Sequence, residues 1–213
     1  MRGLGFEHVR IPPDWTMICG ADTGAYMSAL FVAISPDPYE AMVLAEYPNY
    51  RYVGGEIELL GYPLAEWSWM VREAWKTIQP DRRLHAWCDW NSQFVSELSH
   101  QGIALHRNAK KAELRTEISR EYFQHDKIRL APWLDVLPYE LENAKWPEDV
   151  NASGDYKRVK ESDHTLDCLE HALSRRPRSK RLRETKQKTF IESFLERHRR
   201  PGVARHDVHL GRL

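Results

Sequence analysis

Cysteine, long apolar runs and net charge are all scarce in this sequence, and each scarcity excludes a class of protein. Three cysteines in 213 residues are too few and too scattered for a disulfide framework, and they lack the paired spacing of a zinc site. No segment approaches the roughly 18 apolar residues of a membrane span, and the N-terminus lacks the apolar core of a signal peptide. We therefore expect a cytoplasmic protein with reduced cysteines and no membrane partner.

The formal net charge of zero conceals a division between an acidic body and a basic tail. Residues 175–213 carry 13 basic and 4 acidic side chains, a net charge of +9, which leaves −9 on residues 1–174. A basic tail of this kind is either solvated or in contact with nucleic acid. The sequence predicts a lead-in segment at residues 1–16, one domain at residues 17–175 and the basic tail at residues 176–213.

Three short apolar segments early in the chain predict strands, because each is rich in strand-forming residues and is bounded by turn residues. They are Met17–Asp22, Tyr26–Ile34 and Ala41–Tyr47. Short connections between consecutive strands favour an antiparallel meander. A glycine-containing connection is expected to follow at Asn49–Gly61.

Beyond this connection the sequence alternates between helix and strand patterns. The expected order is helix Leu64–Ile78, strand Leu84–Asp89, helix Ser92–His100, strand Gly102–Leu105, a helix ending near Phe123, an extended segment Ile128–Leu130 and a helix Trp133–Trp146. Such alternation favours parallel strands added beside the meander. The prediction is an α/β domain with a mixed sheet, antiparallel in strands 1–3 and parallel in strands 4–5, flanked by helices.

The segment Ser162–Leu173 predicts a helix with acids and imidazoles where a surface helix usually carries lysines. At about 100° per residue, its leucines share one side, and its acids and histidines share the other. The second group comprises Asp163, His164, Asp167 and His171. With Ser162 as the N-cap, we expect the helix to pack edge-on, its leucines against the flank of the sheet and its acids towards the strand ends.

Two predicted strands end in aspartate, at Asp22 and at Asp89. Carboxylates supplied by separate elements can converge on hard divalent cations, which take oxygen ligands. Three ionised carboxylates about 4 Å apart would repel by about 4 kcal/mol per pair at an effective dielectric constant of about 20, so such a cluster needs a bound cation. Mg²⁺ or Mn²⁺ is the natural occupant. The small residues Gly20 and Gly24 leave room for another element or a ligand to approach Asp22 closely.

Four bases gather at the entrance of the helix that is expected to end near Phe123. They are Arg107, Lys110, Lys111 and Arg115. In a body of net negative charge they are the candidates for contacts with nucleic-acid phosphates. The alternative is a solvated helix face.

Three motifs carry a resemblance to a known family. They are Gly20-Ala21-Asp22-Thr23-Gly24, Trp87-Cys88-Asp89 and Asp163-His164-Thr165-Leu166-Asp167-Cys168-Leu169. Over roughly residues 15–175 the sequence resembles the C-terminal nuclease domain of the large terminase subunit of tailed bacteriophages. The helical motif is the most specific of the three.

The resemblance implies a ribonuclease H-like fold and an endonuclease that cuts concatenated double-stranded viral DNA during genome packaging in the host cytoplasm. It implies that Asp22, Asp89 and Asp167 bind two Mg²⁺ or Mn²⁺ ions, with Asp163 or His164 as an auxiliary ligand or proton carrier. It further implies two-metal hydrolysis that leaves 5′ phosphates. The implied partners are a packaging ATPase, the small terminase subunit and the portal protein.

Large terminases also carry a packaging ATPase, but these 213 residues hold no Gly-x-x-x-x-Gly-Lys-Ser/Thr phosphate-binding loop. We therefore expect either an excised nuclease domain or a nuclease encoded apart from the ATPase. A junction resolvase or a ribonuclease H would share the strand-end acids, and a DNA- or portal-binding module would use only the basic tail. A further alternative is zinc held by His164, Cys168 and His171 on one helix face, which lacks a fourth ligand.

Overall fold

The computed structural model describes residues 11–36, 40–89, 92–144 and 163–176, which all belong to one compact unit, Met1–Pro177. Its centre is a six-stranded mixed sheet in the order β7-β6-β1-β2-β3-β8. The strands of this sheet are β1 (Thr16–Asp22), β2 (Ser28–Ile34), β3 (Ala41–Glu46), β6 (His85–Cys88), β7 (Ala104–Arg107) and β8 (Ile128–Leu130). Of the described helices, none is long and apolar enough to cross a membrane.

The predicted mixed sheet is confirmed. Strands β1, β2 and β3 form an antiparallel meander, and β6 and β7 add parallel to β1. The predicted fifth strand begins two residues later than expected, at Ala104, because Gly102 turns the chain with a φ of +88°. The extended segment β8 joins the sheet parallel to β3, at the edge opposite β7.

The expected connection at Asn49–Gly61 is instead an antiparallel hairpin of β4 (Tyr50–Val53) and β5 (Glu56–Leu59). Its turn is formed by Gly54 and Gly55, both at positive φ, where other residues are strained. A Gly-Gly pair between two short runs containing tyrosine, valine and isoleucine is a hairpin signal, which the prediction of a connection overlooked.

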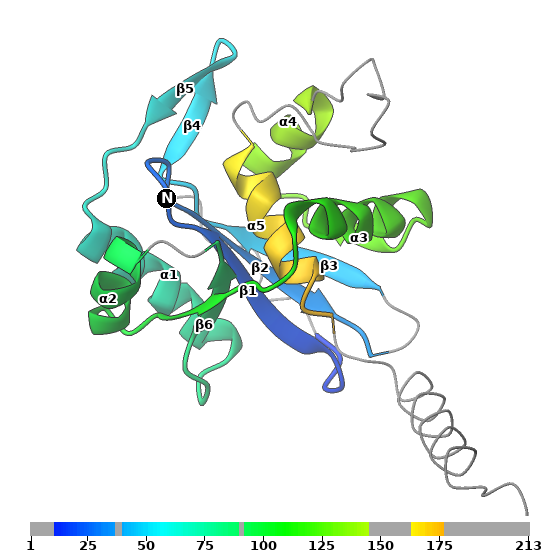
Figure 1. The fold of residues 1–213 in the computed structure, drawn as a ribbon, viewed down its shortest axis with the longest axis horizontal. Helices are drawn as coiled ribbons and strands as arrows, with labels where there is room; N and C mark the ends of the chain where they lie inside the picture. Colours follow the sequence, from blue (N-terminus) through cyan, green and yellow to red (C-terminus); the bar gives the residue numbers. More distant parts are fainter. Residues whose placement is uncertain (1–10, 37–39, 90–91, 145–162, 177–213) are drawn as a thin grey trace, which may run out of the picture. The chain divides into compact units, whose positions relative to one another are not determined.

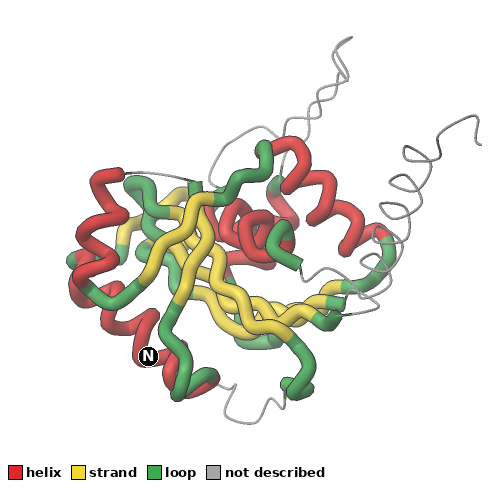
Figure 2. The backbone as a smooth tube through the Cα atoms, turned by 60° about the horizontal axis from the view of Figure 1, so that its bottom comes forward, coloured by secondary structure: helices red, strands yellow, loops and turns green. Residues whose placement is uncertain are grey.

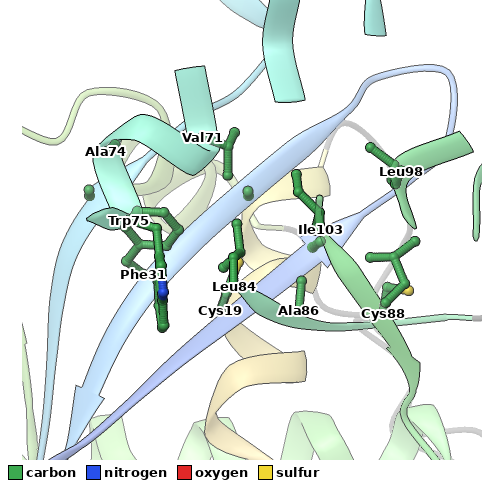
Figure 3. Packing of buried hydrophobic residues seen from close by; sticks show 14 of the residues in the cluster. Cys19, Phe31, Val71, Ala74, Trp75, Leu84, Ala86, Cys88, Leu98 and Ile103 are labelled. Atoms are coloured by element: carbon green, nitrogen blue, oxygen red, sulfur yellow. The ribbon is translucent and has the colours of Figure 1, made fainter. Parts of the chain in front are cut away.

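Helices cover both faces of the sheet (Figure 1; Figure 2). One face packs against α1 (Leu64–Ile78) and α2 (Ser92–His100), whose predicted bounds are confirmed. Figure 3 shows this core, where Phe31 and Trp75 meet edge to face between sheet and helix. The opposite face packs against α3 (Ala112–Gln124), α4 (Val136–Asn143) and α5 (His164–Leu173).

The helix α5 lies directly on the sheet, and the predicted edge-on packing is wrong. Eight of its ten residues are buried, His171 among them. A Cβ atom added to Gly20 would lie 1.9 Å from the carbonyl oxygen of Cys168, so the helix backbone contacts β1 at the one position without a side chain. This close approach explains why the helix crosses β1 and β2 near the strand ends (Figure 1).

Parts of two predicted segments fall outside the described residues. The expected N-cap Ser162 is among them, and so is Trp146 at the end of the predicted helix Trp133–Trp146. The described part of the latter contains only the shorter α4, which starts after Leu134 and Asp135 and accommodates Pro138 in its first turn. The lead-in up to residue 10 and the tail from residue 177 are also outside the described part of the chain.

Candidate active site

The strand-end aspartates and the start of α5 line one open cleft of about 440 Å³. Its lining residues are Asp22, Gly24, Tyr26, Ile57, Asp89, Asp163, His164 and Asp167. The sheet explains the convergence, because parallel strands end at the same edge. The β1–β6 register pairs Gly20 with Trp87, and two further steps place Asp22 opposite Asp89. All five residues predicted as metal ligands or proton carriers therefore border the same cleft.

Asp22 is held by two hydrogen bonds at the end of β1. Its Oδ1 accepts from the backbone N–H of Gly24 at 3.0 Å, and its Oδ2 lies 2.7 Å from Nδ1 of His164. Burial lowers the pKa of His164, but the bond to Asp22 and its negative charge outweigh burial, so the pKa lies above its ordinary value. The ring of Tyr26 packs over the imidazole, with centroids 4.8 Å apart. The imidazolium and the Asp22 carboxylate thus form an ion pair in the cleft wall.

Asp89 is gripped by Arg115 of α3. The guanidinium donates to both carboxylate oxygens at 3.1 Å, and its side chain is only 3% exposed whereas that of Asp89 is 64% exposed. Arg115 was predicted to contact nucleic-acid phosphates, but the structure aims it from the protein interior at a cleft carboxylate. A fork of this kind orients the carboxylate and offsets its charge.

His171 adds a neutral ring behind Asp89. Its Nε2 lies 3.7 Å from Oδ1 of Asp89, and its Nδ1 lies 3.2 Å from the side-chain amide of Asn108. Burial, followed by the positive charge of Arg115, lowers the pKa of His171 to about 4. His171 is therefore neutral at physiological pH, and Arg115 is the cation that balances Asp89 from inside.

The first turn of α5 brings two more acids to the cleft. Asp163 precedes the helix and is 7% exposed, whereas Asp167, one turn later, is partly exposed. Spacing of four residues places both on the same side of the helix. The predicted association of the acids with the strand ends therefore agrees with the structure, although the helix lies flat.

The donor set suits a hard divalent cation, because the cleft offers four carboxylates and one imidazole. Among the described residues, however, no three histidine, cysteine, aspartate or glutamate side chains already lie close enough to hold one ion together. The reason is visible in the ion pairs, since His164 draws Asp22 to one side and Arg115 draws Asp89 to another. The residue types fit Mg²⁺ or Mn²⁺, and protein cations balance two of the carboxylates.

The zinc alternative has no common point of ligation. The thiol of Cys168 is fully buried and faces the carbonyl oxygen of Ser28 at 3.4 Å. His164 faces Asp22, and His171 faces Asn108. The three side chains thus have three separate partners, although they lie close together along α5.

The other three predicted phosphate contacts lie beside the cleft. Arg107, at the end of β7, is exposed and pairs in register with Cys88, the residue before Asp89. Lys111 is exposed at the start of α3. Lys110 is partly exposed, and its ammonium donates to the carbonyl oxygen of Ser174 at the end of α5.

Sequence reasoning missed a buried polar cluster beneath the start of α5. Glu140 of α4 is 2% exposed and accepts hydrogen bonds from Tyr50, Tyr52 and the backbone of Leu166. Burial raises the pKa of Glu140 to about 7, against the lowering effect of these bonds. Only the glutamate within an otherwise apolar turn could have signalled it, since its partners are remote in sequence. Ile57, a cleft residue, was missed together with the hairpin.

Solved structures with this fold are nuclease domains of phage large terminases. The P22 large terminase nuclease domain matches with a TM-score of 0.60 and 11% identity, over 81% of this chain and 88% of that chain. The nuclease domain of the SPP1 large terminase with bound Mn matches with a TM-score of 0.53 and 16% identity, over 76% and 88%. The G20c large terminase nuclease with bound magnesium gives 0.51 and 15%, over 77% and 83%.

A longer large terminase, from another thermophilic bacteriophage, matches over 75% of this chain but only 39% of its own, with a TM-score of 0.52 and 16% identity. The chain thus spans well under half the length of that protein. No protein-family model matches the sequence, and no curated protein sequence does either. At these identities the likeness establishes the fold, and the predicted ribonuclease H-like fold is confirmed.

Proposed function

We propose that this chain is a divalent-metal-dependent endonuclease that cleaves double-stranded DNA during the packaging of a phage genome. The proposal is carried by the convergence of four aspartates from β1, β6 and α5 on one cleft, in a fold shared with phage terminase nucleases. Two of the similar nuclease domains were solved with Mn or magnesium bound, which suits the oxygen-rich donor set here.

In this proposal Asp22, Asp89 and Asp167 hold two Mg²⁺ or Mn²⁺ ions, and Asp163 or His164 is an auxiliary ligand or proton carrier. The bound ions would supply an activated water molecule and stabilise the leaving 3′ oxygen. His164 is suited to carrying a proton, because its ring forms part of the cleft wall and its Nδ1 faces a carboxylate. Arg115 keeps Asp89 directed at the cleft from the interior.

Metal removal is the first test. Wild-type protein is expected to nick and linearise supercoiled plasmid in Mg²⁺ or Mn²⁺, EDTA is expected to stop the reaction, and excess Mn²⁺ is expected to restore it. Gel electrophoresis of the products measures the rates, and circular duplex, branched DNA and RNA–DNA hybrid are compared as substrates. Cleavage that continues unchanged in EDTA would contradict the proposal, and preference for branches or hybrids would favour a resolvase or a ribonuclease H.

Calorimetric titration with Mn²⁺ separates the enzyme from a binding module. A nuclease of this kind is expected to bind Mn²⁺ with an affinity that falls when the cleft carboxylates are neutralised. A DNA- or portal-binding module without turnover would give no saturable heat and no cleavage, while still binding DNA through basic residues.

The basic residues beside the cleft define the proposed DNA path. Arg107 and Lys111 are both exposed, and the register of β7 with β6 places Arg107 next to the strand that carries Asp89. Phosphate contacts position a duplex without reading its sequence, as a nuclease that cuts concatenated DNA requires. Lys110 is the third proposed contact, and Arg115 serves Asp89 in the absence of DNA.

Replacing Arg107 or Lys111 by alanine is expected to weaken DNA binding for all sequences. Each lost phosphate contact lowers the slope of log K against log salt concentration by about 0.9. Fluorescence anisotropy with a labelled duplex across a salt series measures this slope. Arg129→Ala is the matched control, because Arg129 is an exposed arginine on β8, at the opposite edge of the sheet. Equal slopes in all three variants and the wild type would remove both residues from the path.

The proposed division of the chain keeps residues 17–175 as the nuclease domain, residues 1–16 as a lead-in and residues 176–213 as a basic tail. The proposed partners are a packaging ATPase, the small terminase subunit and the portal protein. Their support is the match to 39% of the longer large terminase described above, which leaves the greater part of that protein without a counterpart here.

A further inference from the structure

The start of α5 carries the cleft residues His164 and Asp167, yet its own flanking residue does not cap it. The N-cap residue Asp163 forms no side-chain capping bond. The first N–H groups of a helix have no partner within the helix and must find one elsewhere when they are buried. In this helix, residues from two other elements supply the partners.

Glu140 and Tyr50 bind two N–H groups of the first turn. The Oε2 of Glu140 accepts from the N–H of Leu166 at 2.8 Å, and the hydroxyl oxygen of Tyr50 accepts from the N–H of Thr165 at 3.1 Å. Asp167 follows Leu166 directly, and His164 precedes Thr165. The cleft side chains on either side of this turn are therefore fixed by two bonds from outside α5.

The same two residues are joined in one buried chain of hydroxyls. Tyr50 donates to Oε1 of Glu140 at 2.6 Å, so its oxygen is left to accept from the hydroxyl of Thr165 at 2.8 Å. Thr165 in turn can accept from Ser28 at the start of β2, 3.0 Å away. All four side chains are no more than 2% exposed. The chain connects the sheet, the hairpin, α4 and α5 through directional bonds.

The position of Glu140 is itself fixed from the sheet. Glu46, at the end of β3, accepts hydrogen bonds from the N–H groups of Asp135, Val136 and Leu137 at the start of α4. One carboxylate thus anchors α4 to the sheet, and a second carboxylate anchors α5 to α4. Tyr52 of the hairpin stacks on Tyr139 of α4, with centroids 4.1 Å apart, and also donates to Glu140.

We propose that Glu140, acting with Tyr50, is a positioning residue of the cleft that caps α5 from outside and thereby fixes Asp167 and His164 for metal binding. This proposal rests on the proposed nuclease function for its consequence and on the hydrogen bonds for its geometry. The reason to expect a functional effect is that residues orienting metal ligands, when replaced, typically lower metal affinity or activity about 10- to 100-fold.

Glu140→Gln tests the proposal because it keeps the size of the side chain. The amide oxygen can still accept from the tyrosines, but the amide nitrogen is a donor and would then face the N–H of Leu166. The matched control is Glu142→Gln, which makes the same change at an exposed position of the same helix. Hydrogen exchange of the Thr165 and Leu166 amides is expected to accelerate roughly tenfold or more in Glu140→Gln only.

The second readout is Mn²⁺ affinity at a temperature where each variant is folded. We expect the dissociation constant to rise about 10- to 100-fold in Glu140→Gln, and plasmid cleavage to recover when Mn²⁺ is raised in proportion. A lower melting temperature with unchanged exchange and unchanged Mn²⁺ affinity would overturn the positioning role. If Glu140→Gln does not fold, Tyr50→Phe, which removes the acceptor of the Thr165 N–H, is measured in the same way.

The two proposals fail in different ways. Wild-type protein that neither binds Mn²⁺ nor cleaves DNA rejects the nuclease function and the functional half of the positioning role. Faster exchange in Glu140→Gln would then support the external cap alone. Normal binding and cleavage by wild type, with no change in Glu140→Gln, rejects only the role of Glu140. If neither variant folds, Glu140 is a folding residue and the positioning role is rejected.

Discussion

Replacing Asp22 by asparagine is expected to reduce plasmid cleavage by at least about a thousandfold. A bound divalent ion contributes several kcal/mol to stabilising charge in the transition state, and about 4 kcal/mol corresponds to about a thousandfold in rate. Asp22 is the most informative of the three carboxylates because it stands opposite Asp89 across the β1–β6 register and borders the same cleft as Asp167.

Asparagine separates the charge of Asp22 from its shape. Its side-chain oxygen can still accept from the N–H of Gly24, and its amide group can donate to His164 if the neutral imidazole takes the other tautomer. Asp89→Asn would be harder to interpret, since it leaves the buried guanidinium of Arg115 without its carboxylate partner. We therefore expect Asp22→Asn to fold normally while losing the negative charge at the centre of the site.

The control for this experiment is Asp126→Asn. Asp126 is exposed in the turn before β8 and has a φ of +51°, a conformation that asparagine also tolerates. The control should cleave at the wild-type rate with Mg²⁺, and both variants should melt close to wild type. Cleavage by Asp22→Asn within about tenfold of wild type would remove Asp22 from the metal-binding set.

The strand-end aspartates could be predicted because their placement depends on local pattern and one topological rule. Period-two alternation locates the ends of β1 and β6, and parallel neighbours end at the same edge of the sheet. No long-range detail was needed to bring Asp22 and Asp89 together. The meander and the helix α1 were equally accessible, since strong periodicity and turn residues mark them.

The roles of Arg115 and Glu140 could not be predicted, because both depend on partners distant in sequence. Arg115 lies in a helix with other bases and gives no local sign that it is buried against Asp89, 26 residues away. Glu140 bonds a tyrosine 90 residues earlier. The amphipathic pattern of α5 was also misleading, because a helix enclosed by the sheet, α3 and α4 buries its polar side as well as its leucines.

Gly20→Ala is expected to cost the domain most of its stability. The added Cβ would lie 1.9 Å from the carbonyl oxygen of Cys168 and 2.8 Å from its carbonyl carbon, both of which are helix backbone. Ordinary contacts begin near 3.4 Å, so α5 would have to retreat by roughly 1.5 Å from β1. A rotamer change cannot relieve a clash between two backbones, unlike most overpacking.

The cost follows from what α5 buries at that crossing. Cys168, Leu169, Ala172 and Leu173 are fully buried between the helix and the sheet, and a rigid shift opens gaps beside each of them. We expect a loss of about 4 kcal/mol or more, the range of the most disruptive single substitutions, against a total stability of about 5–15 kcal/mol. For a domain of this size the melting temperature would fall by roughly 8–16 °C.

Gly54→Ala separates this clash from the loss of glycine flexibility. Gly54 has a φ of +61° at the hairpin turn, and no atom lies within 4 Å of an added Cβ, so alanine there incurs only about 1–2 kcal/mol of backbone strain. Thermal unfolding by circular dichroism compares the two variants with wild type. Gly20→Ala should also lose Mn²⁺ affinity in any folded fraction, since the retreat of α5 carries Asp167 away from Asp22. A melting temperature within about 2 °C of wild type would mean that α5 does not rest on β1 at Gly20.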